Sequence, residues 1–249
     1  MTKHRQMIAL VVTTVVLAAV SPATARTVSF SGQQWTVKSS IGQVGPGPNI
    51  FSDSKRNVFV DRRGRLHLRL TRSARHGGRT GGVWYSAEVV GTKSLGYGTY
   101  TWTLDSRVDQ LDPNAVLGLF TWSHDPAYNN REIDIEFTRF GNPMNPFNAQ
   151  RTIAPYTNPA NLSPFVQTTT RRSIHGFTWA PNQVTFQNSN PMFGRWAYAG
   201  TDIPRIGDET PRMNLWLFQG RPPKRAKSIE VIIARFTFTP ISSTADSST

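Results

Sequence analysis

The sequence predicts an all-β protein, a sandwich or jelly roll of antiparallel strands. Short runs rich in β-branched and aromatic residues recur along the 249 residues, and turn residues separate them. No segment shows a sustained apolar period of 3.6 residues over the length of a helix. A chain of this length can bury a core of its own, so we expect one sizeable domain.

The expected strands follow the chain in order. They lie near residues 58–60, 66–71, 83–90, 98–104, 116–122, 132–138, 149–153, 176–179, 183–187, 213–218 and 229–239. Gly, Pro, Asn and Asp pairs between them predict turns, for example Arg63-Gly64 and Pro181-Asn182. The long Asn- and Pro-rich connections are expected to build a binding cleft on the rigid sandwich, namely 43–57, 123–130, 141–148 and 156–163.

The first 25 residues have the pattern of a secretory leader. Basic Lys3 and Arg5 precede an apolar run over residues 7–20, and Ala23-Thr24-Ala25 is a cleavage signal. We expect a signal peptide over 1–25, a catalytic domain over 26–241 and a disordered polar tail over 242–249. No later run approaches the ~20 apolar residues of a membrane span. We therefore expect a secreted, extracellular protein, and a location in the periplasm or cell wall is compatible with this pattern. The alternative is a retained signal anchor.

Charge and cysteine content narrow the chemistry. The formal net charge is +13, which suits an anionic partner such as nucleic acid, a wall polymer or an acidic polysaccharide, or simply keeps the protein soluble. The chain has no cysteine, which excludes thiolate metal sites and a cysteine nucleophile. The histidines lack metal-ligand spacing, and no nucleotide-binding or hydrolase-elbow motif is present.

The densest basic stretch covers residues 62–79. Its basic side chains at positions 65, 67 and 69 alternate with leucines at 66, 68 and 70, which predicts an amphipathic strand with a charged outer face. The favoured interpretation is a solvated face, and docking on anionic material is the alternative.

The segment that carries chemistry is a strand with three carboxylates at period two. Glu132, Asp134 and Glu136 alternate with apolar residues, so the acids share one face and the apolar residues the other. Stacked negative charges repel one another, and a sheet built only for stability should avoid them. The alternative is a solvent-facing acidic row neutralised by arginines.

The spacing suits glycoside hydrolysis. The Cα atoms of Glu132 and Glu136 are ~13 Å apart along a strand. Glutamate side chains that lean together can close this to roughly the 5–5.5 Å carboxyl separation of retaining glycosidases. The charge of Asp134 between them should raise the pKa of a neighbour and help one glutamate to stay protonated as an acid.

These residues resemble glycoside hydrolase family 16. Glu132–Phe137 is similar to its active-site signature in the compact E-x-D-x-E form, without the bulge residue of many β-1,3-glucanases. The compact form is typical of licheninases and of the xyloglucan-active branch. Further similar motifs follow in the family's order between about Trp35 and Phe238, namely Tyr97–Tyr100, Gly118–Trp122, His175–Pro181 and Met213–Trp216.

The resemblance implies a concanavalin-like β-jelly-roll of two antiparallel sheets with a concave substrate cleft. It implies an endo-acting retaining β-glycanase whose substrate is a β-1,3-1,4- or related β-glucan. Glu132 would be the nucleophile, Glu136 the general acid and then base, and Asp134 the residue that holds and tunes them. No catalytic metal or cofactor is implied. A structural calcium ion on the convex face is compatible with the family, although the sequence does not identify its ligands.

Six further residues are candidates for contacts with sugar. Trp122 and Trp216 would stack on sugar faces, and polar groups would bind hydroxyls; the full set is Asn49, Glu88, Trp122, Gln150, Asn214 and Trp216. Core packing is the alternative for each tryptophan. A plain turn role is the alternative for Asn49, which ends a Gly-Pro-rich loop.

Two departures from the family concern the substrate. The chain lacks the cysteines for the licheninase disulfide, and Arg131 and Arg139 flank the acidic strand. The two arginines predict a more cationic cleft than a neutral glucan requires, so an anionic polysaccharide is an alternative substrate.

Three other functions remain open. They are a sugar-binding module without catalysis, a transglycosylase on the same scaffold, and a basic protein whose main partner is anionic. The acids oppose phosphate, so we expect no nucleic-acid partner. We also expect no membrane contact after leader removal, and a monomer.

Overall fold

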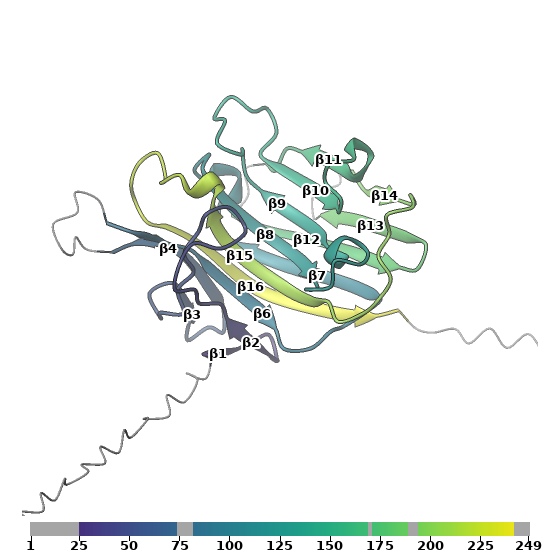
Figure 1. The fold of residues 1–249 in the computed structure, drawn as a ribbon, viewed down its shortest axis with the longest axis horizontal. Helices are drawn as coiled ribbons and strands as arrows, with labels where there is room; N and C mark the ends of the chain where they lie inside the picture. The colour runs from purple at the N-terminus through teal and green to yellow at the C-terminus, as the bar shows by residue number, and fades with distance from the viewer. Residues whose placement is uncertain (1–24, 74–81, 169–170, 189–193, 242–249) are drawn as a thin grey trace, which may run out of the picture.

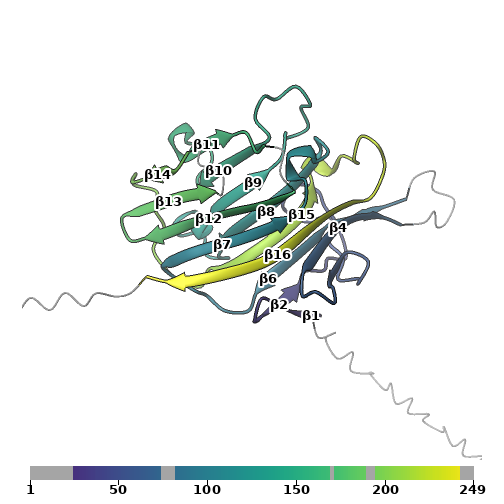
Figure 2. The same cartoon turned by 180° about the vertical axis from the view of Figure 1, so that it is seen from behind.

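The computed structural model describes residues 25–73, 82–168, 171–188 and 194–241. The expected leader, except its last residue, and the expected tail over 242–249 lie outside the described residues, as does the part of the basic stretch within 74–81. Two antiparallel sheets pack face to face, which confirms the predicted all-β sandwich (Figures 1 and 2). No helix in the described part of the chain is long and apolar enough to span a membrane.

The first sheet carries the acidic strand near its centre. Its strands in spatial order are β1 (Thr27–Phe30), β2 (Gln33–Val37), β6 (Ala87–Gly91), β15 (Thr210–Leu217), β8 (Ala115–Trp122), β9 (Ile133–Phe137), β10 (Ala149–Ile153) and β11 (Leu162–Phe165). Antiparallel pairing on both sides of β9 fixes its register, with Glu136 opposite Gly118 of β8 and Gln150 of β10.

The second sheet covers the inner face of the first. Its strands in order are β14 (Trp196–Tyr198), β13 (Gln183–Asn188), β12 (Arg172–Ala180), β7 (Gly98–Asp105), β16 (Ile229–Pro240), β4 (Leu66–Arg72) and β3 (Val58–Val60). The short β5 (Trp84–Tyr85) pairs with β4. The described residues include four 3₁₀ turns in connections, namely η1 (Val108–Gln110), η2 (Asn129–Arg131), η3 (Pro159–Asn161) and η5 (Phe218–Gly220).

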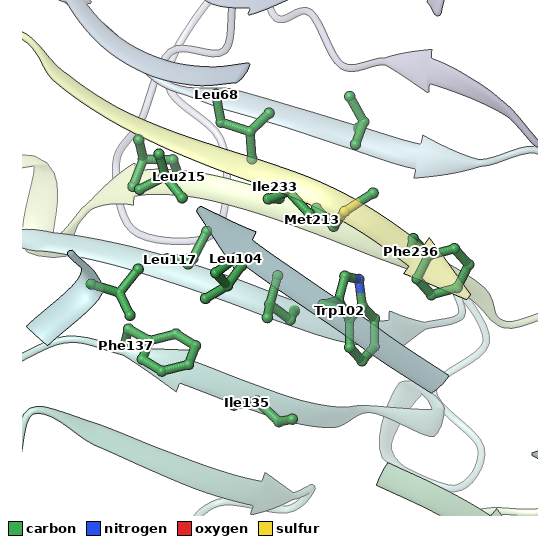
Figure 3. Packing of buried hydrophobic residues seen from close by; sticks show 14 of the residues in the cluster. Leu68, Trp102, Leu104, Leu117, Ile135, Phe137, Met213, Leu215, Ile233 and Phe236 are labelled. Atoms are coloured by element: carbon green, nitrogen blue, oxygen red, sulfur yellow. The ribbon is translucent and has the colours of Figure 1, made fainter. Parts of the chain in front are cut away.

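The core lies between the sheets and fixes which side of each strand faces out. Ile133, Ile135 and Phe137 of β9 are 0–2% exposed and pack inward with Leu117 and Met213 (Figure 3). Because successive side chains of a strand alternate, the acids of β9 must point to the opposite, outer face. The hydrophobic effect on one face therefore holds the carboxylates on the other.

The strand predictions are confirmed for the eleven expected runs, with shifted ends and the run 83–90 divided into β5 and β6. Four strands were missed, namely β1, β2, β11 and β14. Three of these are edge strands, and an edge needs fewer β-forming residues because only one side is paired. Pro164 in β11 is an example, since proline is tolerated only where no ladder hydrogen bond is needed.

The amphipathic strand 66–71 is also confirmed, and its outer charges are paired. Arg65 contacts Asp61 and Asp105, at 2.7 and 2.6 Å. Glu230 accepts from Arg69 at 2.5 Å and lies 2.9 Å from the imidazole Nδ1 of His67. Arg65 and Arg69 of the basic stretch are therefore ion-paired with carboxylates of this surface.

Close approach of β12 to β7 requires a glycine at position 176, because an added Cβ would meet the carbonyl oxygen of Tyr100. We expect Gly176→Ala to lower the free energy of unfolding by about 1–3 kcal/mol, the usual cost of overpacking. Gly42→Ala is the matched control, since no heavy atom lies within 4 Å of its added Cβ. Urea unfolding of the two variants measures the difference, and equal stabilities would contradict the close approach.

Candidate active site

The three acids of the strand line one cavity. Glu132, Asp134 and Glu136 all face a cavity of about 290 Å³ on the outer side of the first sheet. Its lining is completed by residues from five other segments, namely Lys38, Gly45, Pro46, Glu88, Phe120, Trp122, His124, Arg212, Asn214 and Trp216. The alternation therefore brings the acids together as predicted, and it places them among aromatic and polar groups.

Burial makes these carboxyl groups hard to ionise. Burial, reinforced by the charge of Glu136, raises the pKa of Glu132 to about 8. Burial raises the pKa of Glu136 to about 7, and a 2.8 Å hydrogen bond from the Gln150 amide opposes this. Burial and both neighbouring charges raise the pKa of Asp134 well above its usual range. Protonated and ionised carboxyl groups therefore coexist in this cavity near neutral pH.

Glu132 stands between a left-handed turn and the strand. The four residues before it, Tyr128, Asn129, Asn130 and Arg131, all have positive φ, from 51° to 59°. Glu132 itself returns to extended backbone at φ −83°, ψ 119°. Consecutive left-handed residues are rare because each non-glycine residue costs about 1–2 kcal/mol. Strain of this kind concentrates at functional sites, where the surrounding structure over-determines it.

Side chains at both ends hold this turn. The buried Arg131 guanidinium contacts Asp125 at 2.9 Å and donates to the Arg205 carbonyl at 3.1 Å. The Thr121 hydroxyl donates to the Arg131 carbonyl, and the Asn130 amide donates to the Ser123 carbonyl. These bonds offset the strain and fix where Glu132 leaves the turn.

Four of the six predicted sugar contacts line the cavity. Trp122 and Trp216 do so with apolar surface. Glu88 and Asn214 are opposite each other on β6 and β15. The Asn214 side chain accepts a hydrogen bond from the Gly118 amide at 3.1 Å, so part of its capacity is already used.

The other two predicted residues contact the chain instead. Gln150 is not among the described lining residues, but its amide donates to Glu136. Asn49 is 3% exposed, and its amide donates to the carbonyls of Pro46 and Leu217 and accepts from Ser86 and the Leu217 amide. Asn49 thus has the turn role, and the loop that it holds supplies Gly45 and Pro46 to the cavity rim.

The cations of the cavity differ from those expected. Arg131 and Arg139 are not among its described lining residues; Arg131 anchors the turn, and Arg139 donates to the Asn145 carbonyl. Lys38 and Arg212 line it instead, and sequence reasoning missed both. Arg212 had a usable signal, since it lies two residues before Asn214 and hence on the same face of β15. Lys38, just past β2, had none.

No group of three or more His, Asp or Glu side chains among the described residues is arranged to hold a metal ion. The ligands of the calcium ion that the family resemblance allows are therefore not identified, and the chemistry below uses the chain's own residues.

The strained turn generates one prediction. We expect Asn129→Val to lower the free energy of unfolding by about 1–2 kcal/mol, because a β-branched residue is poorly accommodated at φ 51°. Asn129→Gly is the matched control and should be neutral or stabilising, because glycine adopts positive φ freely. Denaturant titration measures both, and a neutral valine variant would contradict the left-handed turn.

The raised pKa values of the glutamates predict how stability depends on pH. Unfolded glutamates titrate near pH 4.3. In the folded chain the pKa values of Glu132 and Glu136 are about 8 and about 7. Between the unfolded and folded pKa values the folded chain therefore binds more protons than the unfolded chain. The free energy of unfolding should accordingly fall as pH rises from about 4.5 to about 8. Glu136→Gln should exceed the wild type by about 1–3 kcal/mol at pH 8, with the gain shrinking toward pH 4.

Glu230 serves as the control for Glu136, because its substitution should change stability at pH 8 in the opposite direction. Burial opposes ionisation of Glu230, but hydrogen bonds from His67 and Arg69 hold its pKa below the usual value. Glu230→Gln should therefore lose stability at pH 8. Equal pH profiles for wild type and Glu136→Gln in thermal unfolding would contradict the buried acid cluster.

No family model matches the sequence, and no similar sequence is found among curated proteins. Solved structures do match. A β-1,3-1,4-glucanase (lichenase) from a mouse hindgut metagenome aligns over 86% of this chain and 96% of its own, with a TM-score of 0.61 and 18% identity. A non-specific endo-β-1,3(4)-glucanase from glycoside hydrolase family 16 aligns over 82% and 83%, with a TM-score of 0.59 and 13% identity.

A third match limits what the fold implies. A Mycobacterium tuberculosis protein, described as an immunostimulatory antigen and pseudo β-1,3-glucanase, aligns over 82% of this chain and 91% of its own. Its TM-score is 0.60 and its identity 22%. At these identities the likeness concerns the fold, which therefore hosts both glucanases and a pseudo-glucanase. This chain has the licheninase-like jelly-roll fold of the family 16 glucanases.

Proposed function

We propose that this chain is an exported, endo-acting, retaining β-glycanase that hydrolyses internal bonds of a β-1,3-1,4- or related β-glucan. One observation carries the proposal: a row of three acids, with buried Asp134 between half-buried Glu132 and Glu136, lines the same cavity as two tryptophans. The cavity supplies acids for proton transfer and nucleophilic attack, and flat apolar surface for sugar rings.

The first step forms a covalent intermediate. The reactive protonation state has Glu132 ionised and Glu136 protonated, and it is the less populated one because the pKa of Glu132, about 8, lies above that of Glu136, about 7. In this state a Glu132 carboxylate oxygen attacks the anomeric carbon while Glu136 gives its proton to the leaving glycosidic oxygen. The carbon–oxygen bond to the leaving sugar breaks, and an ester bond to Glu132 forms. Asp134 stands between the two glutamates, and their charges reinforce the effect of burial in raising its pKa. Its proposed role is to hold and tune its two neighbours.

The second step reverses the roles. Ionised Glu136 takes a proton from water, and the resulting hydroxide attacks the anomeric carbon and releases Glu132 as a carboxylate. Two inversions at the same carbon retain its configuration. Transglycosylation would follow the same path with a sugar hydroxyl in place of water.

The charges of the cavity favour a neutral sugar. Lys38 contacts Glu88 at 2.8 Å, and Arg212 lies 3.4 Å from the other oxygen of the same carboxylate. Glu88 and one ionised catalytic acid together balance these two cations, so no net positive charge remains for a uronate or sulfate. An anionic polysaccharide is therefore the second choice of substrate.

A sugar-binding protein without catalysis is the other candidate. The M. tuberculosis neighbour described as a pseudo-glucanase favours it, because the fold is compatible with lost activity. The acid row opposes it, because a binding site gains nothing from three buried carboxyl groups with raised pKa values.

Export completes the proposal. The supporting feature is the leader-like pattern over residues 1–25, with its basic start, apolar run and small-residue cleavage signal. We propose a single domain over 26–241 that acts as a monomer on an extracellular polysaccharide.

The test is reducing-end release from barley β-glucan, laminarin, xyloglucan and carrageenan. We expect turnover of a neutral β-glucan by the wild type and a loss of at least 10³-fold in Glu132→Gln, because the amide cannot form the glycosyl ester. Glu230→Gln, on the second sheet, is the matched control and should retain turnover.

Each outcome decides something. Retained turnover in Glu132→Gln would sink the assigned roles. Wild-type silence on all four polymers, with intact binding to one, would select the sugar-binding candidate. Activity on carrageenan alone would replace the neutral glucan with a sulfated galactan as the substrate.

A further inference from the structure

A second hollow in the surface shares no lining residue with the acid-lined cavity. Its volume is about 810 Å³, and its walls come from two connections, residues 106–113 after β7 and residues 223–228 after β15 (yellow-green in Figure 1). The first residues of β16 form its third side. We call this hollow the basic groove, because four of its lining side chains are cations, namely Arg107, Lys224, Arg225 and Lys227.

Hydrogen bonds fix the two walls of the basic groove against each other. The Asp112 carboxylate accepts from the backbone amide of Lys224 at 2.8 Å. The side-chain amide of Asn114 donates to the Pro222 carbonyl at 2.7 Å. The backbone of the groove is therefore pre-formed, so a ligand need not order it on binding.

Three of the four cations are free to meet an anion. Arg107 is already paired with Asp109 through two hydrogen bonds of 2.8 and 2.7 Å. Lys224, Arg225 and Lys227 are exposed, and their side chains have no hydrogen bond or ion pair with any residue that the structure describes. Like charges so close along the chain repel one another, and a bound anion would relieve this repulsion.

Two carboxylates also line the groove and limit which anion fits. Glu230 is already occupied, since it accepts from Arg69 at 2.5 Å. Asp112 has no cationic partner within the described part of the chain, and its oxygens accept backbone N–H groups. An anion therefore meets three free cations and one uncompensated carboxylate. A polymer with a charge at every short unit would place one of its charges near Asp112.

Apolar side chains line the groove together with the charges, namely Leu111, Pro113, Pro223 and Ile229. Sugar rings have C–H faces that pack on apolar surface, and in a polyuronate one ring separates each carboxylate from the next. Inorganic polyphosphate has no apolar face and a higher density of charge. The lining therefore favours an acidic polysaccharide over a phosphate chain.

We propose that the basic groove is a second binding site, for a polysaccharide whose repeating unit carries a uronate carboxylate. The carboxylates of successive units meet Lys224, Arg225 and Lys227, and the ring faces pack on the apolar side chains. The site goes beyond the proposed function, since no residue of the acid-lined cavity takes part. It would hold the protein on an acidic matrix.

The test measures binding of polygalacturonate to the full chain by isothermal titration calorimetry. We expect binding at low salt that weakens as salt rises, because salt screens exposed charges. The combined substitutions Lys224→Gln, Arg225→Gln and Lys227→Gln should weaken the affinity by about tenfold or more. The double variant Arg225→Gln and Lys227→Gln replaces this triple variant if the latter does not fold.

A matched variant separates the groove from net charge. Lys55, Arg62 and Arg63 are also exposed, lie outside the groove, and have side chains without a partner among the described residues. Their combined replacement by glutamine removes the same total charge and should weaken the affinity by about twofold at most, since exposed charges far from the ligand are screened. Equal losses in the two triple variants would overturn the inference in favour of diffuse attraction.

Competition and a second polymer decide the place and the ligand. An excess of a neutral β-glucan oligosaccharide should leave polygalacturonate binding unchanged, and displacement would overturn the second site. Tighter binding of inorganic polyphosphate, with the same loss in the groove variant, would overturn the uronate assignment. Absence of polygalacturonate binding by the wild type would overturn the whole inference.

These outcomes are distinguishable from failure of the proposed function. Binding needs no turnover, so the glycanase can fail while the second site stands, and the reverse. Reducing-end release from the active β-glucan by the groove variant should equal that of the wild type.

Discussion

Confinement of three carboxyl groups to one row, at and just before β9, is the constraint on which the site depends. The apolar side chains of β9 hold the strand in the core, and β8 and β10 pair with it on both sides. The acids therefore cannot move apart to relieve their repulsion. The repulsion is instead reduced by protonation, which is why the pKa values of Glu132, Asp134 and Glu136 are all raised. The sandwich thus converts hydrophobic packing on one face into acid–base chemistry on the other.

The first acid differs from the other two because it begins where the regular strand has not yet started. Asp134 and Glu136 are fixed by ladder hydrogen bonds, whereas Glu132 follows four left-handed residues. Arg131 holds those residues from within the protein, and an added Cβ at Gly207 would collide with its guanidinium group. The same turn that costs backbone energy therefore sets the position of one acid independently of the strand.

The features that could be predicted from the sequence are those that depend on the periodicity of apolar residues. Alternation over 132–137 predicted both the core face and the acid face, and turn residues predicted most strand limits. It missed the weakly patterned edges, such as β11 and β14, because one-sided pairing demands little of the residues. The sequence also led to wrong positions for single side chains that belong to no periodic pattern. Arg131 was expected to bring charge to the cleft and is a buried anchor, while Lys38 reaches the cavity from beyond the end of a strand.

A shared fold cannot choose between an enzyme and a binding protein here, because the same sandwich hosts glucanases and a pseudo-glucanase. The electrostatic cost of the site favours the proposed enzyme. A binding site for neutral sugars would be cheaper with amides and hydroxyls, which need no counter-charges. This cavity instead combines a row of acids with two cations and a fourth carboxylate, Glu88, set so that their charges balance only when one acid of the row is ionised. Exchange of a proton between neighbouring acids is useful in a reaction cycle and serves no purpose in static recognition.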